Sequence, residues 1–258
     1  MKFENIRNLA GSVQRRISKA LAKNGGKPYL TEQAGILALH FDALSVQSEM
    51  NIDDPDELVI GYTRAMMSFL LLEPEPCRIA MIGLGGGSIA KYCHRYLPQA
   101  KITVVEINAD VIALRNEFAI PDDSERFSVV LADGAEWVKD AAADVLIVDG
   151  FDASGLPSQL SCQEFYDDCY AALSRDGILV VNLWGGYPHY EDYLERIRIS
   201  FSDCVMVLDA SDSVNKIVLA VKEMPTRPKI RRNAKQLSLT HAVNFMDKSN
   251  RLINALPA

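Results

Sequence analysis

Four short apolar segments of this 258-residue chain each end at residues that can bind a ligand or carry out chemistry. The first, 79–82, runs into the glycine-rich residues 83–88, and an acid follows each of the other three. The acids are Glu106, Asp133 and Asp149, which come after residues 102–105, 128–131 and 144–148. In an open parallel sheet, ligands bind outside the carboxyl ends of the strands. The spacing therefore predicts that the glycines and the three carboxylates surround one site.

Each acid also has a plainer interpretation, as a helix N-cap or an exposed loop residue. For a single acid at a strand end, that interpretation would be preferred. Three acids at the ends of three successive apolar segments favour a shared site, because parallel strands bring all three carboxylates to the same edge of the sheet.

The glycine-rich residues are typical of a nucleotide-binding turn. Their glycines are Gly83, Gly85, Gly86 and Gly87. They connect an apolar run to a stretch of helical character, 89–94, so backbone amides and a helix N-terminus can approach a ligand closely. About 20 residues further on, Glu106 can accept hydrogen bonds from two ribose hydroxyls. Because Ser88 replaces the third glycine of the nicotinamide fingerprint G-x-G-x-x-G, the pattern favours an adenosylmethionine-type ligand over NAD.

Several motifs in and after these segments resemble the polyamine aminopropyltransferases, the spermidine synthase family. The motifs are Val105-Glu106-Ile107-Asn108, Leu131-Ala132-Asp133-Gly134, Ile147-Val148-Asp149-Gly150-Phe151-Asp152 and Glu164-Phe165-Tyr166. The most specific of them is the D-x-x-D loop with E-F-Y downstream. The resemblance extends from about Leu37 to Val221, which is most of the chain.

The resemblance implies a donor, an acceptor and a set of site residues. Asp149 would be the general base that takes a proton from an attacking small-molecule amine, and Asp152 would hold that amine. Glu106 would bind the ribose and Asp133 the adenine of decarboxylated S-adenosylmethionine or S-adenosylmethionine, and no metal is implied. The implied donor-binding residues are Gln47, Tyr62, Gly83, Gly85, Gly86, Gly87, Glu106, Asp133 and Gly134. Two carboxylates three residues apart suit this chemistry, because one can accept a proton while the other pairs with a remote ammonium.

The chain departs from the family pattern at positions that concern positive charge. Gly86 stands where the family has an aspartate that binds the amino end of the decarboxylated donor. Arg64 replaces an acid after Tyr62, Ala153 replaces a proline, and residues 211–215 replace a tyrosine-proline stretch. Each change weakens the expected binding of a cationic substrate.

These departures leave three other functions open. A methyltransferase that uses intact S-adenosylmethionine would tolerate the loss of an acid at Gly86, since that acid would repel the methionine carboxylate. A catalytically silent nucleoside-binding relative is a second alternative, if Arg64 and its neighbours block the amine pocket. A nicotinamide oxidoreductase is the third alternative and the one with the least support.

The elements that must position these residues follow an α/β pattern. Residues 55–222 are predicted to form a Rossmann-like, doubly wound sheet of the class I methyltransferase type, with antiparallel strands 205–208 and 216–220 at its end. Residues 1–54 are expected to hold an amphipathic helix, up to about residue 25, and a β-hairpin from 36–41 and 44–48. Residues 223–258 form a basic tail with a helix.

Composition restricts the remaining possibilities. The net charge is −7, and the basic tail is expected to fold onto the acidic body or a neighbouring subunit rather than bind nucleic acid. The chain has no apolar run of about 18 residues, so no membrane span is predicted. The N-terminus lacks the apolar centre of a secretory signal, and we therefore expect a cytoplasmic protein. The five cysteines are scattered and predicted to be free thiols without a metal. A homodimer is expected.

Overall fold

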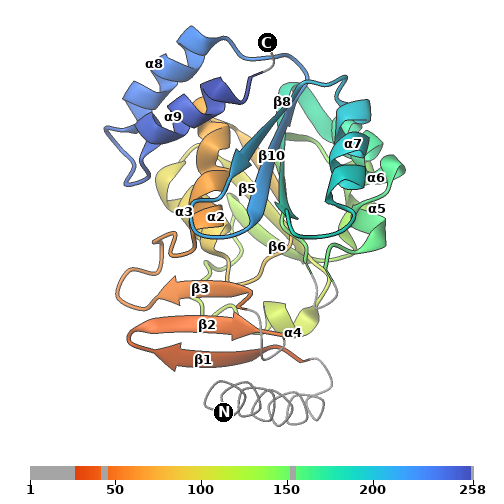
Figure 1. Cartoon of the computed structure of the whole chain (residues 1–258). Helices are drawn as coiled ribbons and strands as arrows, with labels where there is room; N and C mark the ends of the chain where they lie inside the picture. The colour runs from red at the N-terminus through yellow and green to blue at the C-terminus, as the bar shows by residue number, and fades with distance from the viewer. Residues whose placement is uncertain (1–26, 42–45, 152–154, 257–258) are drawn as a thin grey trace, which may run out of the picture.

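The computed structural model describes residues 27–41, 46–151 and 155–256, and this part of the chain contains a seven-stranded and a three-stranded sheet (Figure 1). The strands of the large sheet are β4 (Arg78–Ile82), β5 (Lys101–Glu106), β6 (Phe127–Leu131), β7 (Ala143–Val148), β8 (Leu173–Trp184), β9 (Val205–Asp209) and β10 (Asn215–Val221). Their order is β6-β5-β4-β7-β8-β10-β9. Neighbours from β6 to β8 are parallel, and β10 is antiparallel to both β8 and β9. The predicted α/β Rossmann-like fold is thereby confirmed.

Helices cover both faces of the large sheet. The helices, with short 3-10 turns marked η, are α2 (Gly61–Met66), η1 (Met67–Leu71), α3 (Ser88–Tyr96), α4 (Ala109–Ile112), α5 (Gly134–Trp137), η2 (Val138–Asp140), η3 (Ser158–Leu160), α6 (Gln163–Ala172), α7 (Tyr190–Ser200), α8 (Arg227–Leu237) and α9 (Phe245–Asn254). One face packs against α2, η1, α3, α8 and α9, and the other against α5, α6 and α7 (Figure 1). No helix in the described part of the chain is long and apolar enough to cross a bilayer.

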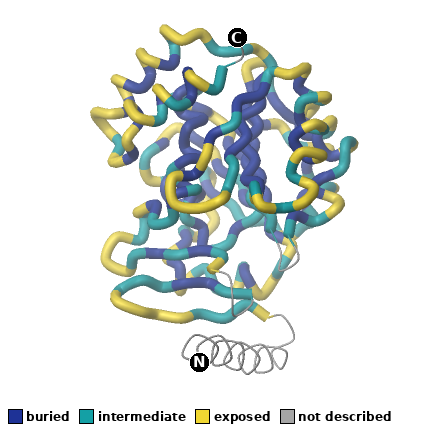
Figure 2. Tube along the Cα trace, viewed as in Figure 1, coloured by how far each residue is buried: buried dark blue, intermediate teal, exposed yellow. Residues whose placement is uncertain are grey.

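The strands divide their side chains between two cores. In β4, Ile79 and Met81 belong to the core under α3 and α8, whereas Ala80 and Ile82 belong to the core under α5 and α6. Strand side chains alternate between faces, and both faces are covered, so apolar residues occupy both sets of positions. The buried centre of Figure 2 is this doubly covered sheet. The ends of its strands are therefore held rigidly, which fixes the residues that follow them.

The small sheet consists of β1 (Tyr29–Gln33), β2 (Ile36–His40) and β3 (Ser48–Asn51), all antiparallel. The sequence analysis predicted two strands here and missed β1, and β3 begins at Ser48, where the second predicted strand was expected to end. Ala34 and Gly35 connect β1 to β2 with φ values of 52° and 78°, a two-residue turn for which Ala34 gives little sequence signal. The predicted N-terminal helix, up to about residue 25, and residues 44–45 of the predicted hairpin lie outside the described residues.

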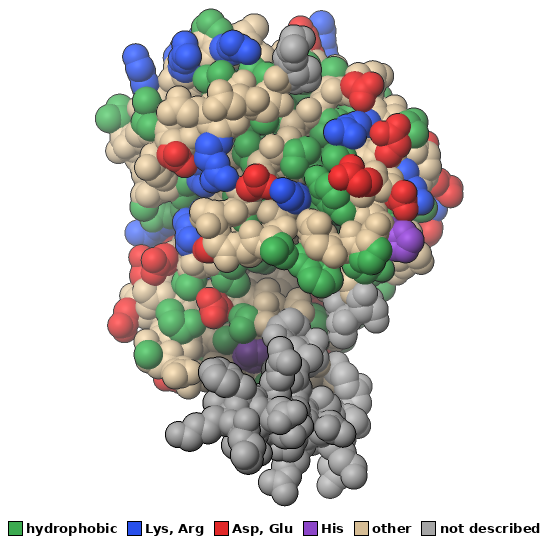
Figure 3. Space-filling model, in the orientation of Figure 1, with side chains coloured by type: hydrophobic (Ala, Val, Ile, Leu, Met, Phe, Trp, Pro, Cys, Tyr) green, Lys and Arg blue, Asp and Glu red, His purple; other side chains and the backbone are tan. Residues whose placement is uncertain are grey.

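The C-terminal segment packs against the large sheet as two helices, where the sequence analysis expected one. The hydroxyl of Thr226 caps α8 and the side chain of Asn244 caps α9, so each helix has its own start signal. Phe245 and Leu252 are fully buried, while Leu239, between the two helices, is 86% exposed. Lysine and arginine side chains gather over α8 at the top of Figure 3. The tail therefore folds onto its own domain and leaves a basic outer face.

His241 joins this C-terminal segment to α3. Its Nδ1 lies 2.8 Å from the hydroxyl of Tyr92, and its ring lies 5.5 Å from those of Tyr96 and Phe245. Burial lowers the pKa of His241 below its ordinary value. The folded protein therefore favours the neutral form of the His241 ring. The helix that His241 contacts, α3, is the one that follows the glycine-rich turn.

This cluster predicts a loss of stability in mild acid. As the pH falls through the ordinary histidine range, near 6.5, the unfolded chain takes up a proton before the folded protein does, and the free energy of unfolding decreases. Below the lowered pKa of His241 the decrease levels off. Urea unfolding at pH 7.5 and 5.5 measures this change, which should be smaller in His241→Gln. An identical pH dependence in the variant would contradict a role for His241.

Candidate active site

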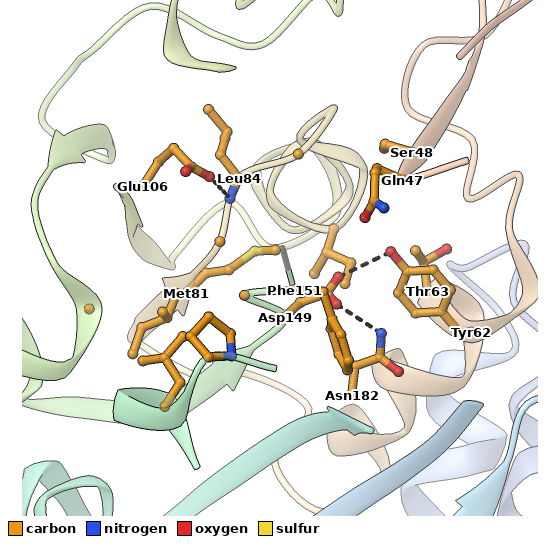
Figure 4. Close-up of a pocket in the computed structure, with 18 of the residues that line it drawn as sticks. Gln47, Ser48, Tyr62, Thr63, Met81, Leu84, Glu106, Asp149, Phe151 and Asn182 are labelled. Carbon is orange, nitrogen blue, oxygen red and sulfur yellow. Dashed lines mark hydrogen bonds between the residues drawn. The ribbon is translucent and has the colours of Figure 1, made fainter. Parts of the chain in front are cut away.

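A cavity of about 610 Å³ lies at the carboxyl ends of β4, β5 and β7, a size typical of small-molecule sites. Its wall comes from the large sheet, the small sheet and the start of α2 (Figure 4). The predicted site residues in that wall are Gln47, Tyr62, Gly83, Gly85, Glu106, Asp133, Gly134 and Asp149. Residues from four strand ends and two preceding segments therefore meet around one space. Asp152 lies outside the described residues.

The glycine turn approaches the end of β7 very closely. Gly83 has φ +97°, and a Cβ on it would lie 2.3 Å from the carbonyl oxygen of Asp149. Gly86 and Gly87 shape the turn but do not belong to the cavity wall. A Cβ on Gly86 would lie 2.6 Å from Oγ of Ser48 and 2.8 Å from Cδ1 of Phe118. The space beside Gly86 is therefore filled from within the chain, which gives a physical reason for glycine where the family has an aspartate.

Glu106 holds the glycine turn in place from the end of β5. Its Oε2 accepts a hydrogen bond from the backbone N–H of Leu84 at 2.9 Å (Figure 4), and its Oε1 accepts one from the N–H of Asn108 at 2.8 Å. The residue is only 8% exposed, yet it lines the cavity. Each carboxylate oxygen can accept a further bond, so Glu106 can tie the turn and bind a ligand hydroxyl together.

Glu106→Ala is expected to weaken the binding of methylthioadenosine, the nucleoside part of the donor that the family resemblance implies, by about 1.5–3 kcal/mol, the range for hydrogen bonds to a charged group. It also leaves the N–H of Leu84 without its acceptor, so calorimetry must be paired with thermal unfolding and circular dichroism. Unchanged affinity in a folded variant would remove Glu106 from the nucleoside site.

Asp133 and Gly134 form the wall of the cavity between β6 and α5. The Oδ1 of Asp133 accepts a hydrogen bond from the N–H of Ala135 at 2.9 Å, which caps α5. A Cβ on Gly134 would lie 2.4 Å from Cγ2 of Ile82, so the helix can start this close to β4 only with glycine there. The N-cap role that the sequence analysis weighed for Asp133 is real, and it coexists with a place in the cavity wall.

Asp149 lies in the cavity with both carboxylate oxygens hydrogen-bonded. Its Oδ2 accepts from the hydroxyl of Tyr62 at 3.1 Å, and its Oδ1 accepts from Nδ2 of Asn182 at 2.8 Å (Figure 4). Burial raises the pKa of Asp149, and the two hydrogen bonds partly oppose that rise. Burial, with the charge of Asp149, also raises the pKa of Tyr62, which keeps its hydroxyl a donor. A carboxylate with a raised pKa and neutral donors is a stronger base than an exposed one.

Asn182 and Asn215 extend this arrangement, and the sequence analysis missed both. The Oδ1 of Asn182 accepts a hydrogen bond from Nδ2 of Asn215 at 2.9 Å, which fixes the orientation of the amide that donates to Asp149. Asn182 is 3% exposed and stands among the apolar residues of β8. A polar residue within a buried apolar strand was the available signal, because such a group needs partners.

Arg64 lies outside the cavity wall. Its guanidinium donates to the carbonyl oxygens of Leu58 and Val59 and forms an ion pair with Asp212 at 3.1 Å. The cation is therefore directed to the backbone and to Asp212 and stays out of the cavity wall, whereas its neighbours Tyr62 and Thr63 belong to that wall.

Among the described residues, no three histidine, cysteine, aspartate or glutamate side chains come together in a way that could hold a metal ion. All five cysteines are free thiols, and two of them, Cys93 and Cys169, are buried.

The seven-stranded sheet and the cavity at the carboxyl ends of its strands define an α/β protein with a Rossmann-like fold and a ligand-sized site where such sheets bind ligands. The sequence profile of the spermine/spermidine synthase domain matches residues 59–215. A polyamine aminopropyltransferase from Chromobacterium violaceum is 38% identical over 229 residues, covering 86% of this chain and 88% of that protein. The chain belongs to the spermine/spermidine synthase family.

Solved structures share the fold. A probable spermidine synthase from Corynebacterium glutamicum superposes with a TM-score of 0.67 and 18% identity, covering 90% of this chain and 92% of that one. Human methyltransferase-like protein 13, in complex with SAH, superposes with a TM-score of 0.62 and 23% identity, covering 70% and 91%. Because both identities are low, these likenesses establish the architecture alone, and aminopropyl and methyl transfer must be distinguished by the site.

Proposed function

We propose that this protein transfers an aminopropyl group from decarboxylated S-adenosylmethionine to a small-molecule amine. The observation that carries the proposal is Asp149, a half-buried carboxylate that faces the same cavity as Glu106 and receives one neutral hydrogen bond on each oxygen. Family membership and the 38% identity to a polyamine aminopropyltransferase support it.

The donor would occupy the part of the cavity between the glycine turn and β6. There Glu106 would bind the ribose hydroxyls, and Asp133 would bind the adenine with the oxygen that does not cap α5. Gly83 and Gly85 have positive φ and carry no side chain, so the backbone of the turn can lie against the nucleoside. This arrangement directs the sulfonium end toward Asp149.

The reaction is a displacement at carbon. The lone pair of the amine nitrogen attacks the aminopropyl carbon that is bonded to sulfur, the new carbon–nitrogen bond forms as that carbon–sulfur bond breaks, and methylthioadenosine leaves with the sulfur electron pair. Asp149 accepts the proton lost by the amine. Tyr62 and Asn182 hold its carboxylate in one orientation, so proton acceptor and nucleophile are aligned before reaction. Asp152, three residues further on, is proposed to hold the acceptor amine, as the family resemblance implies.

Methyl transfer has less support from this structure than from the sequence. It relied on the loss of an acid at Gly86, but Gly86 packs against Ser48 and Phe118 and does not line the cavity. The absence of a side chain there therefore says nothing about a carboxylate on the donor. The silent-relative alternative required Arg64 and its neighbours to block the amine pocket; Arg64 lies outside the wall, and Tyr62 lines the cavity and donates its hydroxyl to Asp149.

The test is release of methylthioadenosine by the purified full-length protein. Decarboxylated and intact S-adenosylmethionine are each supplied with putrescine, cadaverine, spermidine or diaminopropane. We expect release only from the decarboxylated donor and only when an acceptor is present. No release with any of the four amines, together with methyl transfer from intact S-adenosylmethionine, would overturn the proposed function and leave the fold unchanged.

Three expectations from the sequence stay predictions. They are the homodimer, the cytoplasmic location and the boundaries of the N- and C-terminal segments.

A further inference from the structure

A buried lysine lies near the start of α3, the helix that follows the glycine turn. Lys91 is only 1% exposed, and the mechanism proposed above does not use it. Its ammonium group donates a hydrogen bond to the backbone carbonyl oxygen of Phe118 at 2.7 Å. Among the described residues, no carboxylate forms an ion pair with it. Because burying an ammonium group is costly, this single contact is the main compensation for its burial.

The carbonyl group that Lys91 contacts ends a run of helical turns that begins with α4. The N–H of Phe118 donates to the carbonyl oxygen of Leu114 at 3.3 Å, and Ala119 then takes a left-handed φ of 51°. Such a residue ends a helix and leaves its last carbonyl groups without partners inside the helix. A cation beside those carbonyl groups is favourable, so Lys91 anchors the segment around Phe118 to α3.

This segment supports the glycine turn from behind. A Cβ on Gly86 would lie 2.8 Å from Cδ1 of Phe118, and a Cβ on Gly87 would lie 2.6 Å from Cγ1 of Ile120. The backbone N–H of Lys91 also donates to the carbonyl oxygen of Gly87 at 2.8 Å. The opposite side of the turn lines the cavity. A shift of the segment would therefore move the part of the turn that a nucleoside would touch.

Few charged groups surround Lys91. Those on the neighbouring elements are Asp56 before α2, His94 on α3, and Arg115, Glu117, Asp123 and Arg126 between α4 and β6. Arg115 and Asp123 form an ion pair with each other at 2.9 Å. Burial lowers the pKa of Lys91 to about 8, and the charge of Asp56 opposes that fall. Lys91 is therefore charged at neutral pH and becomes neutral in mild base.

We propose that Lys91 is a positioning residue for the nucleoside, because its ammonium group holds Phe118, and through it the glycine turn, in the arrangement that binds the donor. The inference rests on the donor site of the proposed function and adds a residue that does not line the cavity. A bound nucleoside requires the turn in this position, whereas the empty turn can move with its support. The charge on Lys91 and the nucleoside then favour the same arrangement, so each strengthens the other.

Calorimetry with methylthioadenosine from pH 7 to pH 9.5 tests this inference, because the ligand itself does not titrate in that range. In the wild-type protein, Kd should rise about three- to tenfold, since a charged hydrogen bond is roughly twice as strong as a neutral one. Lys91→Arg keeps its charge throughout, so its Kd should stay constant. Lys91→Met should bind at pH 7 at least as weakly as wild type does at pH 9.5, with no further change.

A second readout separates positioning of the turn from general damage to the site. At pH 7 the KM of Lys91→Met for the donor should rise, while kcat at saturating donor stays within about twofold of wild type, because the contacts of Asp149 are unchanged. Urea unfolding identifies the folded variants. Either Lys91 variant is sufficient alone, since both remove the titration.

Lys248→Met is the matched control. Burial also lowers the pKa of Lys248 to about 8, but this lysine lies on α9, which packs against η1, α8 and β9. Its Kd for methylthioadenosine should rise with pH as in the wild-type protein.

Three results would overturn the inference. They are a wild-type Kd that does not change with pH, a rise in folded Lys91→Arg equal to that in wild type, or loss of the rise in Lys248→Met. Failure of the proposed function would look different. The protein would then bind methylthioadenosine with the expected pH dependence but release none from the decarboxylated donor.

Discussion

Asp149→Asn is expected to lower the turnover of aminopropyl transfer by about 10²–10⁴-fold, the usual contribution of a positioned base, with methylthioadenosine affinity nearly unchanged. The substitution preserves the shape of the side chain. Its carbonyl oxygen can still accept from Asn182, and the hydroxyl of Tyr62 can rotate to accept from the new amide. The change therefore removes the proton acceptor alone. In the wild-type enzyme, turnover should fall in acid as Asp149 becomes protonated, at a higher pH than for an ordinary aspartate, because burial raises its pKa.

Asp133→Asn is the matched control for this variant. It replaces another carboxylate of the same cavity, and asparagine is as good an N-cap for α5 as aspartate. We expect a higher KM for the donor with a much smaller effect on turnover. Single-turnover kinetics with methylthioadenosine calorimetry separate the two effects. If Asp149→Asn kept most of its turnover while folded, Asp149 would not be the base.

Gly83→Ala is expected to destabilise the protein by about 2–4 kcal/mol and to abolish nucleoside binding, combining the strain of a positive φ with overpacking. The φ of Gly83 is +97°, and the new Cβ would lie 2.3 Å from the carbonyl oxygen and 2.8 Å from the carbonyl carbon of Asp149. Both neighbours are backbone atoms that anchor the end of β7. The clash therefore moves the glycine turn and Asp149 apart. Urea unfolding and methylthioadenosine calorimetry measure the two effects.

Gly35→Ala separates the two causes. Gly35 also has a positive φ, +78°, but nothing lies within 4 Å of the position of its Cβ. This variant should lose only about 1 kcal/mol and keep its nucleoside affinity. Equal losses in Gly35→Ala and Gly83→Ala would mean that the close approach of β4 to Asp149 has no energetic consequence.

The large sheet and the strand-end residues of the cavity wall could be predicted from the sequence alone. Apolar segments followed at once by a glycine turn, Glu106, Asp133 and Asp149 are local signals, and parallel strands bring such ends to one edge whatever the loops between them do. Motifs around Asp149 also sufficed to identify the family resemblance. Predicting these features does not require knowing which distant side chains are in contact.

The arrangement of charges around Asp149 depends on contacts that form only in the folded chain. Tyr62 and Asp149 are 87 positions apart and Arg64 and Asp212 are 148 apart, and no local pattern states that either pair should form. The sequence analysis therefore took Arg64 as an obstacle to the amine, and it read the missing acid at Gly86 as a clue to the donor. In the folded chain Asp212 pairs with Arg64, while Ser48 and Phe118 fill the space beside Gly86. The roles of Arg64 and Gly86 depend on residues of other elements, which become their neighbours only when the chain folds.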